Sequence, residues 1–156
     1  HATTFHRFYL STIEKMEAIP HLSLEFFKLV FESMREEIVL ILAEDQGTPI
    51  AGSLCYKKGD CLFGRYWGAI RKVRNLHFEL CYYQPLEWAI SRKVKLFEAG
   101  AQGEHKISRG FLPELTFSAH WICHPGFREA IARFIEQEKK AIQGLFEEIE
   151  PHHPYS

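Results

Sequence analysis

The order of its β-rich runs constrains the fold of this chain most strongly. Three such runs, IVLILAED, IAGSLCYK and CLFGRYWGA, are separated by two short turns at residues 46–49 and 58–60. Both turns contain glycine, and runs joined by such short connections pair as antiparallel neighbours. Residues 38–69 therefore predict a three-stranded antiparallel meander.

A change of period follows the meander. Beyond a basic loop at residues 71–75, the run HFELCYYQPLEWAISRKV has apolar positions that suit a helix, with Pro85 in its first turn. KLFEAGA then predicts a short strand, and LTFSAHWI (residues 115–122) predicts another. A strand, a helix and a second strand form a crossover connection, so part of the sheet is expected to be parallel.

Helices are predicted at both ends of the chain. The first 36 residues suggest two helices, the second capped by Ser23, and residues 127–149 carry apolar side chains along one side. The sequence thus predicts an α/β domain over residues 1–150 with a mixed sheet and flanking helices. Residues 151–156 are expected to form a disordered tail.

Length and charge limit the classes of function. A chain of 156 residues predicts one domain, and its net charge of -1 argues against a dedicated nucleic-acid binder. Residues 57–110 nevertheless hold eleven Lys or Arg against five Asp or Glu. This local excess could attract an anionic substrate group such as a phosphate, or it could consist of solvated lysines on loops.

Cysteine usage and hydropathy indicate the compartment. Cys55, Cys61, Cys81 and Cys123 show no CxxC spacing, which suits buried free thiols in a reducing cytosol. No aliphatic run is long enough to cross a bilayer, so we expect a cytoplasmic protein without membrane insertion. The chain begins at His1 rather than Met, which predicts that sequence precedes it.

The first candidate site lies in NLHFELCYY. His77 and Glu79 are two positions apart, so they would share a face on a strand but not at a helix start. Such a pair could accept a proton from an attacking amine; alternatively, Glu79 stabilises a helix N-terminus and His77 is simply partnered. Tyr82 and Tyr83 could protonate a leaving group, or they could be core and boundary residues.

The second candidate site is the stretch FEAGAQGEHKISRG. It holds Glu98, Glu104, His105, Lys106 and Arg109 within twelve positions, and its glycines would let a ligand approach the backbone. An arginine can hold a carboxylate or phosphate through two parallel hydrogen bonds, which a lysine cannot do. A polar, solvated loop is the alternative. Neither GxGxxG nor GxxxxGK[ST] is present, so the stretch carries no phosphate-binding signature.

A metal site is disfavoured. His120, Cys123 and His124 lie close together in SAHWICH, but no paired ligand set occurs elsewhere in the sequence. His120 could instead point into the same pocket as Glu98. The absence of a GxSxG motif also argues against hydrolysis through a covalent serine intermediate.

Three blocks of this sequence resemble a known family. GRYWG, LHFELCYYQPLEWAI and FEAGAQGEHKISRGFLPELTFSAHW are similar to the FemAB-like predicted N-acyltransferases of the GNAT superfamily, described as peptidoglycan biosynthesis or recognition proteins. The resemblance runs from about residue 5 to residue 121. It implies a GNAT-like fold and transfer of an acyl or aminoacyl group to an amine in peptidoglycan-related metabolism. Family members resemble two fused GNAT-like halves, of which this chain resembles the C-terminal one, so a missing N-terminal half or a homodimer is an expected partner.

The resemblance also implies site residues and a donor. The catalytic candidates are His77, Glu79, Tyr82, Tyr83 and Glu98, and the binding candidates are Gln102, Glu104, His105, Lys106, Arg109 and His120. The basic loop AIRKVRN stands where GNAT enzymes usually have a Gly-rich pyrophosphate loop. The donor therefore stays open between acyl-CoA and aminoacyl-tRNA, the acceptor is a small-molecule or peptide amine, and no metal is expected.

These residues support one mechanism and one alternative. In the mechanism, Glu79 or Glu98, assisted by His77, accepts the proton of the attacking amine. Lys106 and Arg109 hold an anionic group, and Tyr82 or Tyr83 protonates the leaving group. In the alternative, the chain is a non-catalytic half that recognises a cell-wall peptide or pairs with the missing half.

Overall fold

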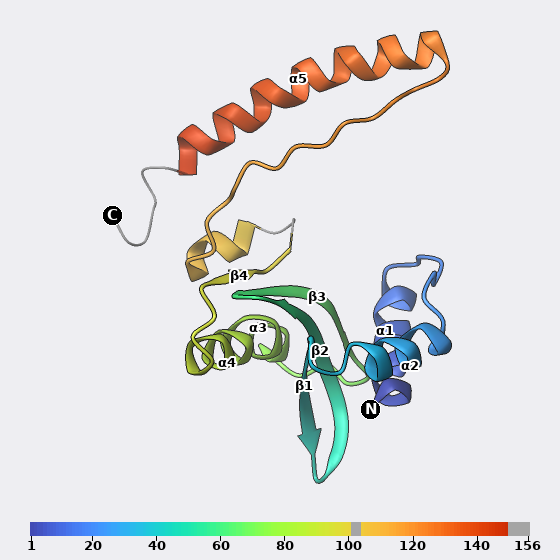
Figure 1. Ribbon diagram of the computed structural model, residues 1–156, viewed down its shortest axis with the longest axis vertical. Helices are drawn as coiled ribbons and strands as arrows, with labels where there is room; N and C mark the ends of the chain where they lie inside the picture. Colours follow the sequence, from blue (N-terminus) through green and yellow to red (C-terminus); the bar gives the residue numbers. More distant parts are fainter. Residues whose placement is uncertain (101–103, 150–156) are drawn as a thin grey trace. The chain divides into compact units, whose positions relative to one another are not determined.

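The computed structural model describes residues 1–100 and 104–149 of the chain. The chain divides into two compact units, His1–Ala101 and Gln102–Ser156. The first unit contains every strand of the sheet (Figure 1). The expectation of one domain over residues 1–150 remains a prediction, and the predicted tail at residues 151–156 lies outside the described residues.

The first unit is built on a four-stranded mixed sheet in the order β1-β2-β3-β4. Its strands are β1 (Ile38–Asp45), β2 (Thr48–Lys58), β3 (Cys61–Ala69) and β4 (Leu96–Glu98). β1, β2 and β3 are antiparallel neighbours, whereas β3 and β4 are parallel. The predicted meander, the crossover and the mixed α/β architecture are thereby confirmed.

The turn between β1 and β2 explains why this hairpin forms. Gln46 and Gly47 both have positive φ angles, 50° and 75°. A two-residue turn with two positive φ values has the same twist as the strands that it joins. The sequence signal at this turn therefore corresponds to a specific backbone conformation.

Helices α1 (Ala2–Lys15) and α2 (Leu24–Ser33) cover one face of the sheet (Figure 1). The Ser23 side chain accepts a hydrogen bond from the Phe26 N–H, which confirms the predicted cap. The core on this side is formed by five buried side chains, Phe5, Phe8, Tyr9, Phe27 and Leu54.

The opposite face is covered by the crossover connection, which was predicted as one helix. It consists of α3 (Leu76–Phe78), the π-helical turn η1 (Glu79–Tyr83) and α4 (Gln84–Ser91), which follow one another without a break (Figure 1). Pro85 lies at the start of α4, as expected. Because proline has no N–H to donate, the regular α-helical pattern is interrupted here, and the Gln84 N–H donates to the Glu79 carbonyl five residues back.

The second unit contains the short 3-10 helix η2 (Glu104–Arg109) and the long helix α5 (Pro125–Ile149). The prediction of a strand at residues 115–122 is wrong, because this segment forms neither helix nor strand. Its apolar side chains alternate as in a strand, yet Phe117 and Trp121 are 91% and 81% exposed. A single extended segment is not stable as a strand without a neighbour, and the described part of this unit offers none.

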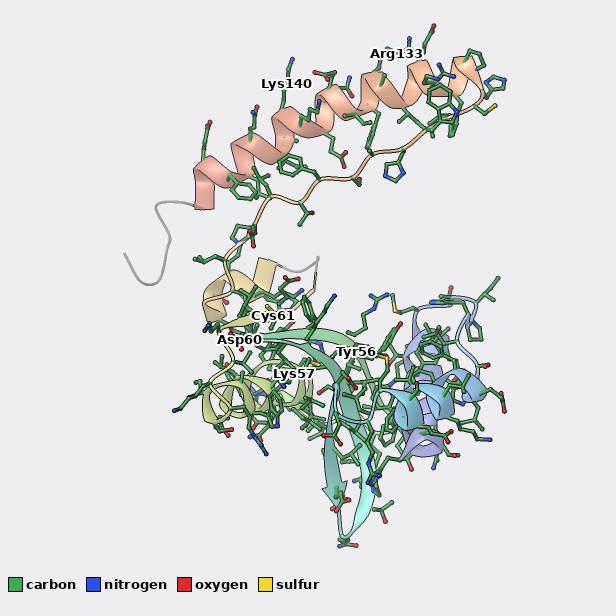
Figure 2. The ribbon with its side chains drawn as sticks, in the orientation of Figure 1. Tyr56, Lys57, Asp60, Cys61, Arg133 and Lys140 are labelled. Atoms are coloured by element: carbon green, nitrogen blue, oxygen red, sulfur yellow. The ribbon has the colours of Figure 1, made fainter. Side chains whose placement is uncertain are left out.

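Helix α5 confirms the predicted closing helix. It begins at Pro125, where the His124 Nδ1 accepts a hydrogen bond from the Phe127 N–H. Arg133 and Lys140 lie on its polar side (Figure 2). Within residues 1–100 and 104–149, no helix combines the length and the apolar character needed to cross a membrane.

Candidate active site

The pairing of β3 with β4 ends partway along β3, and we call the edge of β3 beyond that point the opening. The two strands pair over only three residues each, Cys61–Phe63 with Leu96–Glu98. Within the described residues, β3 then continues to Ala69 beyond the last residue that pairs with β4. Ligands of α/β sheets bind beyond the carboxyl ends of strands where the connections diverge, so this opening is the first place to look for a site.

A β-bulge marks the start of the opening. The register between β2 and β3 shifts, so that Leu54 faces Tyr66 while Cys55 faces Gly64. Arg65 lies between these two pairs and has no residue opposite on β2. Bulges of this kind are common beside active sites because they redirect a side chain.

The unpaired edge of β3 carries hydrogen-bonding groups. The Ile70 N–H donates to the Ile50 carbonyl of β2. In an antiparallel pair, successive residues point their backbone N–H and carbonyl groups alternately toward and away from the partner strand. The N–H groups of Trp67 and Ala69 therefore point away from β2. The carbonyls of these two residues accept hydrogen bonds from α1, at 2.9 Å from the Thr12 hydroxyl and 2.8 Å from the Ser11 hydroxyl. Helix α1 is thus fastened to β3 along the same edge toward which these N–H groups point.

His77 lies on the sheet face covered by the crossover connection. Its half-buried ring meets the ring of Trp67 at 5.1 Å and that of Tyr82 at 5.6 Å between centroids, both edge to face. Tyr82 is buried, whereas the adjacent Tyr83 is 46% exposed. The structure therefore brings His77 and Tyr82 together and leaves Tyr83 at the surface.

Glu79 does not form a pair with His77. Both residues are helical, and side chains two positions apart on a helix point in different directions. Glu79 is exposed, and its Oε1 accepts a hydrogen bond of 2.9 Å from the Gln84 side chain.

Glu98 ends β4 at the opening and is exposed. Its neighbour Phe97 packs against a buried cluster that contains Leu62 of β3 and Ala89 of α4. Because successive strand residues face opposite ways, Glu98 faces the side of the sheet that α1 and α2 cover. Glu98 and His77 therefore belong to opposite faces of the sheet.

The loop after β3 supplies positive charge. Arg71 forms an ion pair with Asp45, and Lys72 and Arg74 are exposed. Asn75, with a φ of 62°, turns the chain from this loop into α3. The cations of the loop therefore lie at the C-terminal end of β3.

The remaining candidates lie in the second unit. His105, Lys106 and Arg109 are part of η2, where the Arg109 guanidinium donates to the His105 carbonyl at 2.5 Å. Glu104 begins η2, and Gln102 lies outside the described residues. His120 is exposed on the extended segment, with its Nε2 at 3.1 Å from the Ser118 hydroxyl.

The cysteines and histidines show no metal-binding arrangement in the part of the chain that the structure describes. No group of three His, Cys, Asp or Glu side chains there could hold an ion. His124 instead caps α5. Cys55 is buried, and burial raises the pKa of its thiol to about 12, whereas Cys123 is exposed.

Arg65 was not among the sequence candidates. Its charge was counted in the basic stretch, but the sequence offered no reason to select it. Gly64, which precedes it, is the one local signal, since glycine within a strand often marks a bulge.

Comparisons with known proteins give the fold and the family. The fold resembles that of a ribosomal-protein-alanine N-acetyltransferase from Brucella melitensis biovar Abortus 2308, with a TM-score of 0.53 and 10% identity over 80% of this chain and 94% of that one. It also resembles AAC(6')-Iy in complex with the bisubstrate analogue CoA-S-monomethyl-acetylneamine, with a TM-score of 0.50 and 13% identity over 74% of this chain and 90% of that one. No curated protein matches the sequence significantly.

The sequence model of one family matches residues 1–156, and that family is described as acting in peptidoglycan biosynthesis and recognition. The predicted GNAT-like fold agrees with the acetyltransferase neighbours. The chain belongs to the FemAB-like family.

Proposed function

We propose that this chain transfers an acyl group directly from a thioester donor to an amine at the opening between β3 and β4. The observation that carries the proposal is the end of β3–β4 pairing at Phe63 and Glu98, next to the bulge at Arg65. The fold shared with N-acetyltransferases and the FemAB-like family both support acyl transfer.

The edge of β3 at the opening, where we propose that the acyl donor binds, suits an extended molecule with amide groups. The N–H groups of Trp67 and Ala69 can donate hydrogen bonds to the carbonyls of such a molecule, as they would to an added strand. Lys72 and Arg74 follow directly and can attract its phosphates. We therefore propose acyl-CoA as the donor, in line with the CoA analogue bound by one structural neighbour, and aminoacyl-tRNA is the competing donor.

Glu98 is our proposed general base. In the reaction, the amine nitrogen bonds to the thioester carbon, the carbon–sulfur bond breaks, and the amine proton passes to the Glu98 carboxylate. On the opposite face, His77 and Tyr82 contact each other, and we assign this pair to the donor side, where Tyr82 gives a proton to the leaving thiolate. Exposed Tyr83 is the other phenol available for this step.

Lys106 and Arg109 are proposed to hold an anionic part of the donor or the acceptor. Both belong to η2, and the arginine can form two parallel hydrogen bonds with a phosphate or carboxylate. Gln102, Glu104, His105 and His120 are proposed as further binding residues from the family resemblance.

Calorimetric titration of the chain with CoA and with acetyl-CoA tests the donor. We expect saturable binding that weakens at least about tenfold when Lys106 and Arg109 are both changed to Gln. The matched control changes Arg133 and Lys140 on the polar side of α5 to Gln, which alters the net charge equally (Figure 2). No binding of either compound excludes acyl-CoA as the donor of this chain and favours aminoacyl-tRNA. An equal loss in the control attributes the effect to net charge alone.

Turnover with acetyl-CoA and a panel of primary amines tests the base. Glu98→Gln should lower the rate about 100-fold while leaving CoA affinity unchanged, because it removes the proton acceptor and not a donor contact. Glu44→Gln, an exposed change at the end of β1, is the control. Undiminished turnover in Glu98→Gln contradicts its role as base. CoA binding without any turnover favours a recognition function.

A further inference from the structure

We propose that Arg65 binds the carboxylate of the acceptor, which makes the acceptor an amine that also carries a carboxylate, such as an amino acid or a peptide. This inference rests on the proposed function, because it names the substrate class for the same opening. It concerns a residue that the family resemblance did not select.

The first argument is position. The bulge leaves Arg65 of β3 without a pairing partner on β2. Phe63, two residues earlier, is the last β3 residue that pairs with β4. Arg65 is therefore at the point where the sheet opens, and its exposed side chain is accessible to a ligand there.

The second argument is orientation. The Arg65 guanidinium carbon lies over the Tyr66 ring, 5.0 Å from its centroid. The Tyr66 ring also contacts the rings of Tyr9 and Phe27 edge to face, with centroid distances of 6.1 and 6.2 Å. Cation–π attraction to a fixed ring restrains the guanidinium, whose N–H donors lie in its own plane, where a planar carboxylate can bind through two parallel hydrogen bonds.

The third argument is the lack of a counter-charge. In the described part of the chain, no carboxylate lies within ion-pair distance of Arg65. Three cations of the same unit do have ion-pair partners, Lys28 with Glu25, Arg71 with Asp45 and Lys95 with Asp60. Arg65 is thus held in place by an aromatic ring while its charge is left for a partner outside the unit.

The fourth argument is the charge pattern on this face. Arg65 stacks on Tyr66, which packs against α1 and α2, and Glu98 faces the same side of the sheet. A positive and a negative side chain at one opening match a ligand that carries a carboxylate and an amine. Tyr56, on β2 and labelled in Figure 2, packs on this face, and burial, more than the nearby Tyr66, raises the pKa of its hydroxyl. Its protonated hydroxyl is a further hydrogen-bond donor.

The test measures binding without any donor present. The Arg65 Nε–H resonance of the full chain is followed by nitrogen-15 NMR during titration with alanylalanine, and separately with its C-terminal amide. We expect a saturable shift with the acid and at least about tenfold weaker binding of the amide, because the amide cannot form the charge-assisted pair of bonds. Equal affinity for the two, or no shift with the acid at millimolar concentration, overturns the proposal.

Variants separate Arg65 from a general effect of charge. Binding followed by calorimetry should be lost in Arg65→Gln and only partly retained in Arg65→Lys, since lysine cannot form two parallel bonds. Arg92→Gln is the matched control, because Arg92 also lies over an aromatic ring, that of Trp88 at 6.0 Å. Unchanged binding in Arg65→Gln, or an equal loss in Arg92→Gln, contradicts the assignment.

Inorganic phosphate distinguishes the acceptor from the donor. If phosphate displaces alanylalanine and binds Arg65 more tightly, the residue serves donor phosphates and the inference falls. If alanylalanine binds as expected while CoA and acetyl-CoA do not bind at all, the carboxylate site stands and the proposed donor fails. The two proposals can therefore fail separately.

Discussion

The hydroxyl of Ser53 donates a hydrogen bond of 2.5 Å to the carbonyl of Leu80, joining the buried centre of β2 to the π-helical turn. The reason lies in the turn itself. Within the crossover connection, the Gln84 N–H donates to Glu79, and Pro85 has no N–H to offer. The Leu80 carbonyl therefore obtains its donor from the sheet.

Ser53→Ala should destabilise the fold by about 2 kcal/mol, because it leaves the Leu80 carbonyl buried without a donor. The free energy of unfolding, measured by urea denaturation, checks this value. The matched control is Ser91→Ala, whose exposed hydroxyl donates to the Trp88 carbonyl, and which should cost less than about 0.5 kcal/mol. Equal costs for the two variants would contradict the role given to Ser53.

A double variant tests the reason for this contact. Pro85→Ala restores a backbone N–H within reach of the helical carbonyls, so it should cost less in the Ser53→Ala protein than in the wild type. Strict additivity of the two unfolding free energies would show that Pro85 does not cause the missing donor at Leu80.

Gly68 allows α1 to pass close to β3. A Cβ atom at Gly68 would overlap the Phe8 carbonyl and lie 2.9 Å from the Phe8 Cβ. Gly68→Ala should therefore destabilise the first unit by at least about 3 kcal/mol, since backbone atoms cannot move aside cheaply. Gly144→Ala in α5 meets no atom within 4 Å and should stabilise that helix by about 1 kcal/mol. Thermal unfolding followed by circular dichroism measures both, and a well-tolerated Gly68→Ala would count against this packing.

Asp60 and Lys95 connect the β2–β3 turn to the start of β4 through an ion pair of 2.8 Å. The hydrogen bond from Lys95, and then its charge, lowers the pKa of Asp60 below its ordinary 3.8, and the same contacts raise the pKa of Lys95 above 10.5. The Asp60 contribution is therefore fully present above pH 3.8 and is lost as the pH falls through the lowered pKa. The Lys95 contribution is lost only as the pH rises beyond 10.5.

Asp60→Asn tests this pH dependence. The urea midpoint of the variant should lie slightly below that of the wild type near neutral pH, and the two should converge in acid. The difference should be small and should shrink in high salt, because both side chains are exposed to solvent. A difference that grows on acidification would show that the sign is wrong.

Cys55 should resist thiol reagents in the folded protein. Burial raises its pKa to about 12, so at pH 8 the group is almost entirely the unreactive thiol. Exposed Cys123 should be alkylated by iodoacetamide within the same period, and mass spectrometry of digested peptides resolves the two sites. In urea both should react at similar rates. Rapid native labelling of Cys55 would show that β2 opens readily.

Much of the first unit could be predicted from local sequence patterns. The turn at Gln46 and Gly47, the cap at Ser23 and the apolar period of the crossover connection each specify structure within a few residues. Such signals depend on φ preferences and on local hydrogen bonds, so they can be recognised without knowledge of distant contacts. The segment at residues 115–122 shows the limit of this reasoning, since its alternation is that of a strand but its pairing depends on a neighbour.

The candidate site could likewise be predicted from the sequence only in part. Glu98 was selected for its place on a predicted strand and His77 for its pairing with Glu79, and the family resemblance implied both as site residues. The opening at Phe63, the bulge that exposes Arg65, and the opposite faces of Glu98 and His77 were decided by the tertiary structure. These features depend on how β2 and β4 align with β3, and that register follows from packing between residues far apart in the sequence.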